Sequence, residues 1–183
     1  MIRASVWSIV LAGGDGRRVR ELSVDRSGHP VPKQFWSFDG GPSLLRRTLN
    51  RLHPLIPQSR TVPVVAASHA RWWAKELADL PYENVVVQPA NRGTAAGVLL
   101  PLLHILQQDM DAMVMVVPSD HYVEDEAVLR SRATRAIEAV ERERDRMVLL
   151  GMKPETDVHD YGWIVPAGDH FDPVRPVEEF VEK

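Results

Sequence analysis

The stretch SVWSIVLAGGDGRR, residues 5–18, gives the strongest indication of the fold expected for this chain. Its first eight residues are almost continuously apolar, which is typical of a strand buried on both faces of a sheet. Gly13, Gly14 and Gly16 follow the strand directly. Glycines allow the backbone to turn sharply and to bring its N–H groups against a phosphate. The stretch therefore predicts a buried strand followed by a phosphate-binding loop. The alternative is a tight turn from strand to loop, with solvated arginines and no ligand.

Similar short apolar runs alternate with segments of helical spacing along the rest of the chain. The run at residues 112–117 is the most apolar and is expected to be the central strand. The helix expected at residues 94–108 is apolar almost all round, so we expect it to be buried, with Thr94 as its cap. Further strands are predicted at residues 62–67, 84–88, 147–151, 162–165 and 177–181, and further helices from Ser43, at residues 68–80 and at residues 124–144.

Strands that alternate with helices predict an α/β fold, here a three-layer αβα sandwich around a mainly parallel, Rossmann-like sheet. In such sheets ligands bind outside the carboxyl ends of the strands. That rule selects the segments that follow Ala12, Val87 and Val117. No internal repeat or linker divides the sequence, so residues 1–183 are expected to form a single domain.

Composition and charge exclude several classes of protein. The chain holds 44% hydrophobic and 26% charged residues, which is the balance of an ordinary folded domain. It has no cysteine, which excludes disulfides, thiolate metal sites and cysteine nucleophiles. The net charge of −3 argues against nucleic acid or an anionic membrane as a partner. No targeting segment or membrane span is visible, which leaves a cytoplasmic location by elimination.

The basic residues gather near the front of the chain. Residues 1–60 hold 10 Lys/Arg and 4 Asp/Glu, a net of +6, although the whole chain is acidic. Among them Lys33, after Pro32, could bridge phosphates as a compact charge, although a lone lysine is more often a solvated surface group. Two common phosphate motifs do not fit. Val19 takes the place of the third glycine of the dinucleotide fingerprint, which disfavours a nicotinamide dehydrogenase, and no Gly-Lys-Ser/Thr triplet exists for a P-loop.

Six segments, in order along the chain, carry a resemblance to a known family. The glycine loop with Arg18, followed by PKQF at residues 32–35, resembles the signature of sugar-nucleotide pyrophosphorylases, a G-x-G-T-R loop followed by P-K. The whole set most resembles the mannose-1-phosphate guanylyltransferases. The other matching segments are QPANRGTA (88–95), VPSDH (117–121), LGMKP (150–154), YGWI (161–164) and FVEK (180–183).

The resemblance implies a fold of the nucleotide-diphospho-sugar transferase type and a reaction. A sugar 1-phosphate attacks the α-phosphorus of a nucleoside triphosphate, pyrophosphate leaves and a nucleotide sugar forms, with mannose 1-phosphate and GTP as the expected substrates. Mg²⁺ is the implied cofactor. Catalysis of this kind depends on positioning and charge neutralisation. The sequence leaves a homodimer open.

The resemblance also implies roles for the matching residues. Arg18, Lys33 and Asp120 would be catalytic, and Asp120 would also be the ligand of Mg²⁺. The sugar phosphate would be bound by Gly162, Glu182 and Lys183. The nucleotide would be bound by Leu11, Ala12, Gly13, Gly14, Gly16, Arg18, Gln88, Asn91, Gly93 and Thr94, with the base read by the Gln88 amide and the Gly93 backbone.

Departures from the family pattern keep a second class of function open. Arg17 stands where the family loop has a threonine, and His159-Asp160 replace a Thr-Gly pair near the expected sugar pocket. The family motif continues past Glu-Lys to a second metal-binding aspartate, so the chain is expected to be either the first part of the catalytic domain or a reduced relative. The alternative function is a non-catalytic module that binds a nucleotide or sugar phosphate and regulates a partner. Asp120 itself has a simpler alternative role, as a helix cap.

Overall fold

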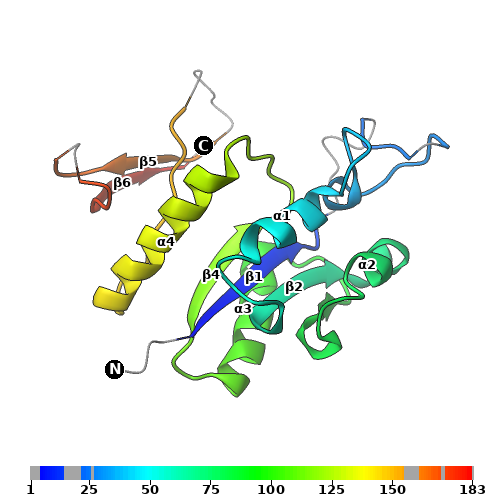
Figure 1. Ribbon diagram of the computed structural model, residues 1–183, viewed down its shortest axis with the longest axis horizontal. Coiled ribbons are helices and arrows are strands. Elements are labelled where there is room, and N and C mark those ends of the chain that lie inside the picture. Colours follow the sequence, from blue (N-terminus) through cyan, green and yellow to red (C-terminus); the bar gives the residue numbers. More distant parts are fainter. Residues whose placement is uncertain (1–4, 15–21, 26, 155–160, 170–171, 183) are drawn as a thin grey trace. The chain divides into compact units, whose positions relative to one another are not determined.

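The computed structural model describes residues 5–14, 22–25, 27–154, 161–169 and 172–182 (Figure 1). The chain divides into two compact units, Met1–Arg130 and Ser131–Lys183. A four-stranded sheet with its helices belongs to the first unit, and a two-stranded ribbon belongs to the second.

Four parallel strands form the centre of the first unit. β1 pairs with β2 on one side and with β4 on the other, so that Ile9 lies opposite both Val62 and Val116. These strands confirm four of the predicted ones to within two residues at each end. The sheet has the order β3-β2-β1-β4 and is built from β1 (Val6–Ala12), β2 (Thr61–Ala66), β3 (Val86–Gln88) and β4 (Met113–Pro118).

In the sheet described, the most apolar strand does not take the central position that the sequence predicts for it. β4 lies at the edge of the four strands described, and none of its residues is fully buried, whereas every residue of β2 is. A continuous apolar run shows that the faces of a strand are suited to being covered. It does not reveal how many neighbouring strands the run will pair with.

Helices cover both faces of this sheet and confirm the predicted three-layer αβα sandwich. On one face, α1 (Leu44–Leu52) and α2 (Ala70–Glu76) share a core with Val10 of β1. On the other face, α3 (Gly93–Gln108) packs against a core that contains Ile9. Successive residues of a strand point to opposite faces, so β1 contributes to both cores.

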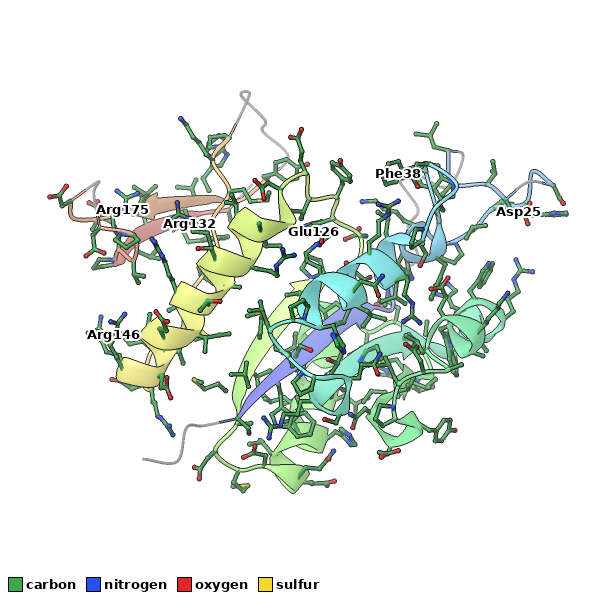
Figure 2. All side chains as sticks on the ribbon, viewed as in Figure 1. Asp25, Phe38, Glu126, Arg132, Arg146 and Arg175 are labelled. Atoms are coloured by element: carbon green, nitrogen blue, oxygen red, sulfur yellow. The ribbon has the colours of Figure 1, made fainter. Side chains whose placement is uncertain are left out.

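Helix α1 begins as its sequence predicts and is tied to two other elements. The Ser43 hydroxyl caps it by accepting a hydrogen bond from the Arg46 N–H (3.1 Å), and it donates to Glu76 Oε2 of α2 (3.0 Å). Arg51 of α1, whose side chain is only 7% exposed, pairs with Glu126 at 3.3 Å. Figure 2 shows Glu126 in the first turn of helix α4 (Glu126–Arg142).

Helix α3 is less buried than its apolar sequence predicts. Gly97, Pro101 and Ile105 are buried at a four-residue spacing. A helix in the outer layer of a sandwich meets the sheet along one stripe, so apolar residues all round it are not all covered. The exposed leucines of α3 are Leu99, Leu100 and Leu103.

No helix in the described part of the chain is both long and apolar enough to cross a membrane.

The second unit contains an antiparallel ribbon, formed by β5 (Trp163–Pro166) and β6 (Val177–Val181). Both strands match their predictions closely. The strand predicted at residues 147–151 is wrong, because those residues adopt no regular structure. A strand requires a hydrogen-bonded neighbour, and none of the strands described pairs with this run.

The carboxyl-terminal end of α3 is joined to the start of β1 through Asp109. Its Oδ2 atom accepts hydrogen bonds from the Ser5 hydroxyl and from Trp7 Nε1, the second at 3.1 Å. These donors hold the pKa of Asp109 below the ordinary value of an aspartate. The unfolded chain therefore binds this proton more tightly, so the stability that Asp109 confers is present at neutral pH and is lost as the pH falls through the folded pKa.

Lowering the pH from about 7 to about 3 should therefore lower the urea midpoint of unfolding, partly through Asp109. Asp109→Asn should make that fall smaller, because an amide does not titrate. Asp111→Asn, at an exposed neighbouring carboxylate, is the control and should keep the wild-type pH dependence. Equal pH dependence in Asp109→Asn and the wild type would show that the bonds from Ser5 and Trp7 do not contribute to acid sensitivity.

Candidate functional site

The carboxyl ends of the parallel strands lie together at one end of the sheet, which we call its carboxyl edge (Figure 1). The chain leaves this edge through Gly13 after β1, through Gln88 at the end of β3 and through Ser119 after β4. Helix α3 starts a few residues after β3, so its amino-terminal end belongs to the same edge. Strand ends and helix amino termini are where α/β proteins bind ligands, and anionic ligands in particular.

The side chain of Gln88 is buried against two glycines. A Cβ atom placed on Gly13 would lie 3.1 Å from Gln88 Oε1, and one placed on Gly97 would lie 3.9 Å from Gln88 Nε2. Gly13 therefore leaves space for the carboxamide, whereas the distance at Gly97 is an ordinary contact. The structure brings together Gly13 and Gln88, both of which the sequence predicted to bind a nucleotide.

Lys33 and Asp120 meet at this edge although 87 positions separate them in the sequence. Lys33 opens the short 3-10 helix η2 (Lys33–Phe35), and its Nζ atom donates to Asp120 Oδ2 at 3.1 Å. The two side chains are 33% and 39% exposed. Solvent therefore screens the pair, which contributes about 0–1 kcal/mol to stability. The structure pairs two of the three residues that were predicted to be catalytic.

Asp120 does not cap the helix that follows it. Helix α4 begins at Glu126, and Asp125 accepts hydrogen bonds from two backbone N–H groups of its first turn, at 2.9 and 3.0 Å. The capping alternative for Asp120 is therefore wrong. Its carboxylate is directed to Lys33 instead.

The carboxylate of Asp120 suits a Mg²⁺ ion that is shared with a substrate. Proteins hold Mg²⁺ through one or two carboxylates together with phosphate oxygens and water. Among the residues described, no cluster of three or more His, Asp or Glu side chains could hold a metal. Asp120 therefore fits as a single ligand to an ion whose other partners are phosphate oxygens. The donor set does not fit a metal bound by these protein side chains alone.

The turn before α3 joins two of the predicted residues to each other. Asn91 Oδ1 accepts a hydrogen bond from the Gly93 N–H at 3.0 Å, and Gly93 has a φ of +82°, which favours glycine. The prediction that Thr94 caps α3 is wrong, because the helix begins at Gly93 with Arg92 as its N-cap. Since the Gly93 N–H already donates to Asn91 Oδ1, it can donate to a base only if this hydrogen bond opens.

Two buried polar residues of the site, Gln34 and Ser119, were missed by the sequence analysis. Gln34 Nε2 donates to the carbonyl oxygens of Ala12 (2.8 Å) and Gly14 (3.0 Å). The Ser119 hydroxyl donates to the carbonyl oxygen of Leu11 at 2.6 Å. Both side chains hold the backbone where β1 passes into the glycine loop. The signal that could have found them is their position, since each is adjacent in sequence to a predicted catalytic residue.

The residues predicted to bind the sugar phosphate belong to the second unit. A Cβ atom on Gly162 would lie 2.8 Å from Phe180 Cζ, so the Phe180 ring occupies the space that a side chain at position 162 would need. Glu182 is exposed just after β6. The other predicted site residues, Gly16, Arg18 and Lys183, lie outside the described residues, as do Arg17, His159 and Asp160.

A pocket lies at the opposite edge of the sheet, where β2 begins at Thr61. Its charged residue Arg46 donates two hydrogen bonds to Asp79, at 2.9 and 2.8 Å. The guanidinium is thus already neutralised by a carboxylate and offers little attraction to a phosphate. The pocket is lined by Arg46, Leu49, Asn50, His53, Ile56, Gln58, Thr61 and Leu80.

The chain thus has a parallel α/β sheet with glycines, a lysine and a carboxylate at the carboxyl ends of its strands, which is typical of proteins that bind phosphorylated ligands. The family model described as "Nucleotidyl transferase" matches residues 7–183. This chain belongs to that family.

Curated relatives match almost the whole chain. The alginate biosynthesis protein AlgA of Pseudomonas syringae pv. tomato is 34% identical, over 96% of this chain and 36% of its own length. A mannose-1-phosphate guanylyltransferase of Salmonella muenchen is 33% identical, over 96% of this chain and 36% of its own length. The chain thus spans about 36% of the length of these relatives.

Solved structures share the fold. The crystal structure of a mannose-1-phosphate geranyltransferase from Thermus thermophilus matches with a TM-score of 0.80 and 31% identity, over 98% of this chain and 50% of that chain. A mannose-6-phosphate isomerase from Helicobacter pylori matches with a TM-score of 0.69 at 21% identity, over 98% of this chain and 60% of that chain. The second match supports the fold alone.

Gly13→Ala should destabilise the protein, because its Cβ would lie 3.1 Å from Gln88 Oε1 and the buried carboxamide must shift to admit it. Overpacking of this kind costs about 1 kcal/mol or more, which lowers the Tm by roughly 2–4 °C. Gly14→Ala is the matched control, since nothing lies within 4 Å of a Cβ at that position. Equal Tm values for the two variants in thermal unfolding would contradict the close approach of Gln88 to Gly13.

Proposed function

We propose that the protein transfers a nucleoside monophosphate from a nucleoside triphosphate to a sugar 1-phosphate, with GTP and mannose 1-phosphate as its substrates. We further propose that residues 1–183 belong to a single nucleotidyltransferase domain. The observation that carries the proposal is the 3.1 Å contact between Lys33 Nζ and Asp120 Oδ2 at the edge that holds the glycine loop. The names of the relatives support the choice of substrates.

In the proposed reaction an oxygen of the sugar 1-phosphate attacks the α-phosphorus of the triphosphate. The bond from that phosphorus to the bridging oxygen breaks, so that a nucleotide sugar and pyrophosphate form. Both reactants are anions and the transition state spreads negative charge over several oxygens. Fixed positive groups and N–H donors therefore account for most of the catalysis, and no protein nucleophile is needed.

Lys33 supplies the positive charge in this scheme. Its ammonium group exchanges the carboxylate of Asp120 for phosphate oxygens at little cost, because a solvent-screened ion pair is worth about 0–1 kcal/mol. Asp120 would hold Mg²⁺ once Lys33 turns to the phosphates, and the ion, when bound, shares the negative charge of the phosphates.

The base and the sugar phosphate are assigned to the residues that the sequence predicts for them. The Gln88 carboxamide can both donate and accept, as the edge of a base requires, and it lies against Gly13 of the loop assigned to the triphosphate. Gly162 and Glu182 are proposed to contact the sugar phosphate. A cytoplasmic location and a homodimer stay predictions.

The test is release of pyrophosphate by the protein mixed with GTP, mannose 1-phosphate and Mg²⁺. Lys33→Ala and Asp120→Ala should each lower kcat by about a hundredfold, the usual effect of removing one electrostatic contact to a transition state. Other nucleoside triphosphates and sugar 1-phosphates, assayed in parallel, decide the base and the sugar.

Two exposed residues give matched controls. Lys75→Ala removes another of the four lysines, on α2, and Asp111→Ala removes a carboxylate at the opposite end of β4 from Asp120. Both should keep wild-type kcat. Binding of GTP without pyrophosphate release would favour a non-catalytic binding module, and no binding of any nucleoside triphosphate would overturn the proposal.

A further inference from the structure

The side chain of Gln34 is buried where β1 passes into the glycine loop, and its NH₂ group donates to the last residue of β1 and to Gly14. Gln34 is 3% exposed, and its Nε2 atom donates to the Ala12 carbonyl oxygen at 2.8 Å and to the Gly14 carbonyl oxygen at 3.0 Å. A carbonyl oxygen can only accept, so the NH₂ group and not the amide oxygen must face these two atoms. The orientation of the carboxamide is therefore fixed by its partners.

The bond to Ala12 determines the direction of the N–H group of Gly13, at the start of the loop. In a trans peptide the carbonyl and the N–H of the next residue point in opposite directions, and none of the peptide bonds described is cis. Because the Ala12 carbonyl points to Gln34, the Gly13 N–H faces away from Gln34. Glycine has more backbone freedom than any other residue, so the bonds to the carbonyl oxygens of residues 12 and 14 restrict the backbone at Gly13 and Gly14.

The position of Gln34 is itself fixed by its surroundings. It lies within η2, whose turn is closed by hydrogen bonds from the Phe35 N–H to the Pro32 carbonyl (2.8 Å) and from the Trp36 N–H to the Lys33 carbonyl (3.1 Å). The same short turn therefore places Lys33 against Asp120 and places Gln34 against the carbonyl oxygens of Ala12 and Gly14.

A group of three packed rings, those of His69, Phe35 and Trp72, lies next to the Gln34 side chain. His69 Nδ1 lies 3.5 Å from Gln34 Nε2. The His69 ring packs edge-on against Phe35 and Trp72, with centroid distances of 6.0 and 5.7 Å. Phe35 and Trp72 stack nearly parallel to each other. Gln34 is therefore held in one place by packed rings.

We infer that Gln34 is a positioning residue, which holds the backbone of residues 12–14 in the conformation that receives the phosphates of the nucleotide. The inference rests on the proposed function, because it assigns the loop to a nucleoside triphosphate. Gln34 does not touch the phosphates in this account and acts only through the backbone of residues 12–14.

The test compares the affinities of GTP and GMP, measured by calorimetry with Mg²⁺, for the wild type and for Gln34→Met. Methionine keeps the volume of glutamine and removes both donors. The Kd for GTP should rise about tenfold, which corresponds to 1.4 kcal/mol, whereas the Kd for GMP, which has one phosphate, should rise less than threefold. A role in packing alone would lower the Tm and leave the ratio of the two Kd values unchanged.

Gln58→Met is the matched control. Gln58 also donates through Nε2, to Asp79 Oδ2 at 3.1 Å, but it lies just before β2 at the opposite edge of the sheet. It should keep both wild-type Kd values. If Gln34→Met does not fold, Gln34→Asn takes its place, since its amide is one methylene too short to reach both carbonyls and should raise the Kd for GTP at least threefold.

The outcomes separate this inference from the proposed function. Failure of the wild type to bind GTP overturns the proposed function and the inference with it. Binding of GTP with equal Kd by the wild type and the Gln34 variant overturns only the positioning role. A parallel rise of the Kd values for GTP and GMP overturns it as well, because it would show a general loss of the site.

Discussion

Parallel pairing of β1 with β2 and β4 sets the positions of the helices and of the candidate site. Leu11 lies opposite Val64 on one side and Pro118 on the other, so β1 and its two neighbours end at the same edge. Strands that run in one direction need long connections, and here helices supply them on both faces of the sheet. The same pairing brings Lys33 and Asp120 together, although the chain between them includes most of the first unit.

Much of this arrangement could be predicted from the sequence, because apolar runs of strand length and glycines at their ends are local signals. The location of the site at the carboxyl edge followed from the same signals and one topological rule. The edge position of β4, the exposure of one face of α3 and the irregular run at residues 147–151 could not be predicted. Each depends on which neighbour covers or pairs with an apolar segment, and the composition of the segment does not contain that information.

The site shows the same division between local and tertiary information. Motifs predicted Gly13, Lys33, Gln88 and Asp120, and the structure places Lys33 against Asp120 and Gln88 against Gly13. Gln34 was missed because a glutamine next to a lysine looks like any other polar surface residue. Its importance becomes visible only when its burial and its two carbonyl partners are known, since a buried amide must find partners.

Binding of the nucleotide at the carboxyl edge of the sheet can be followed through the assigned backbone and side-chain amide resonances of the protein during a titration with GTP and Mg²⁺. We expect the largest shifts at Gly13, Gly14, the Gln88 side chain and Asp120. Shifts confined to the pocket at the opposite edge, where β2 begins, with no change in the glycine loop, would contradict it.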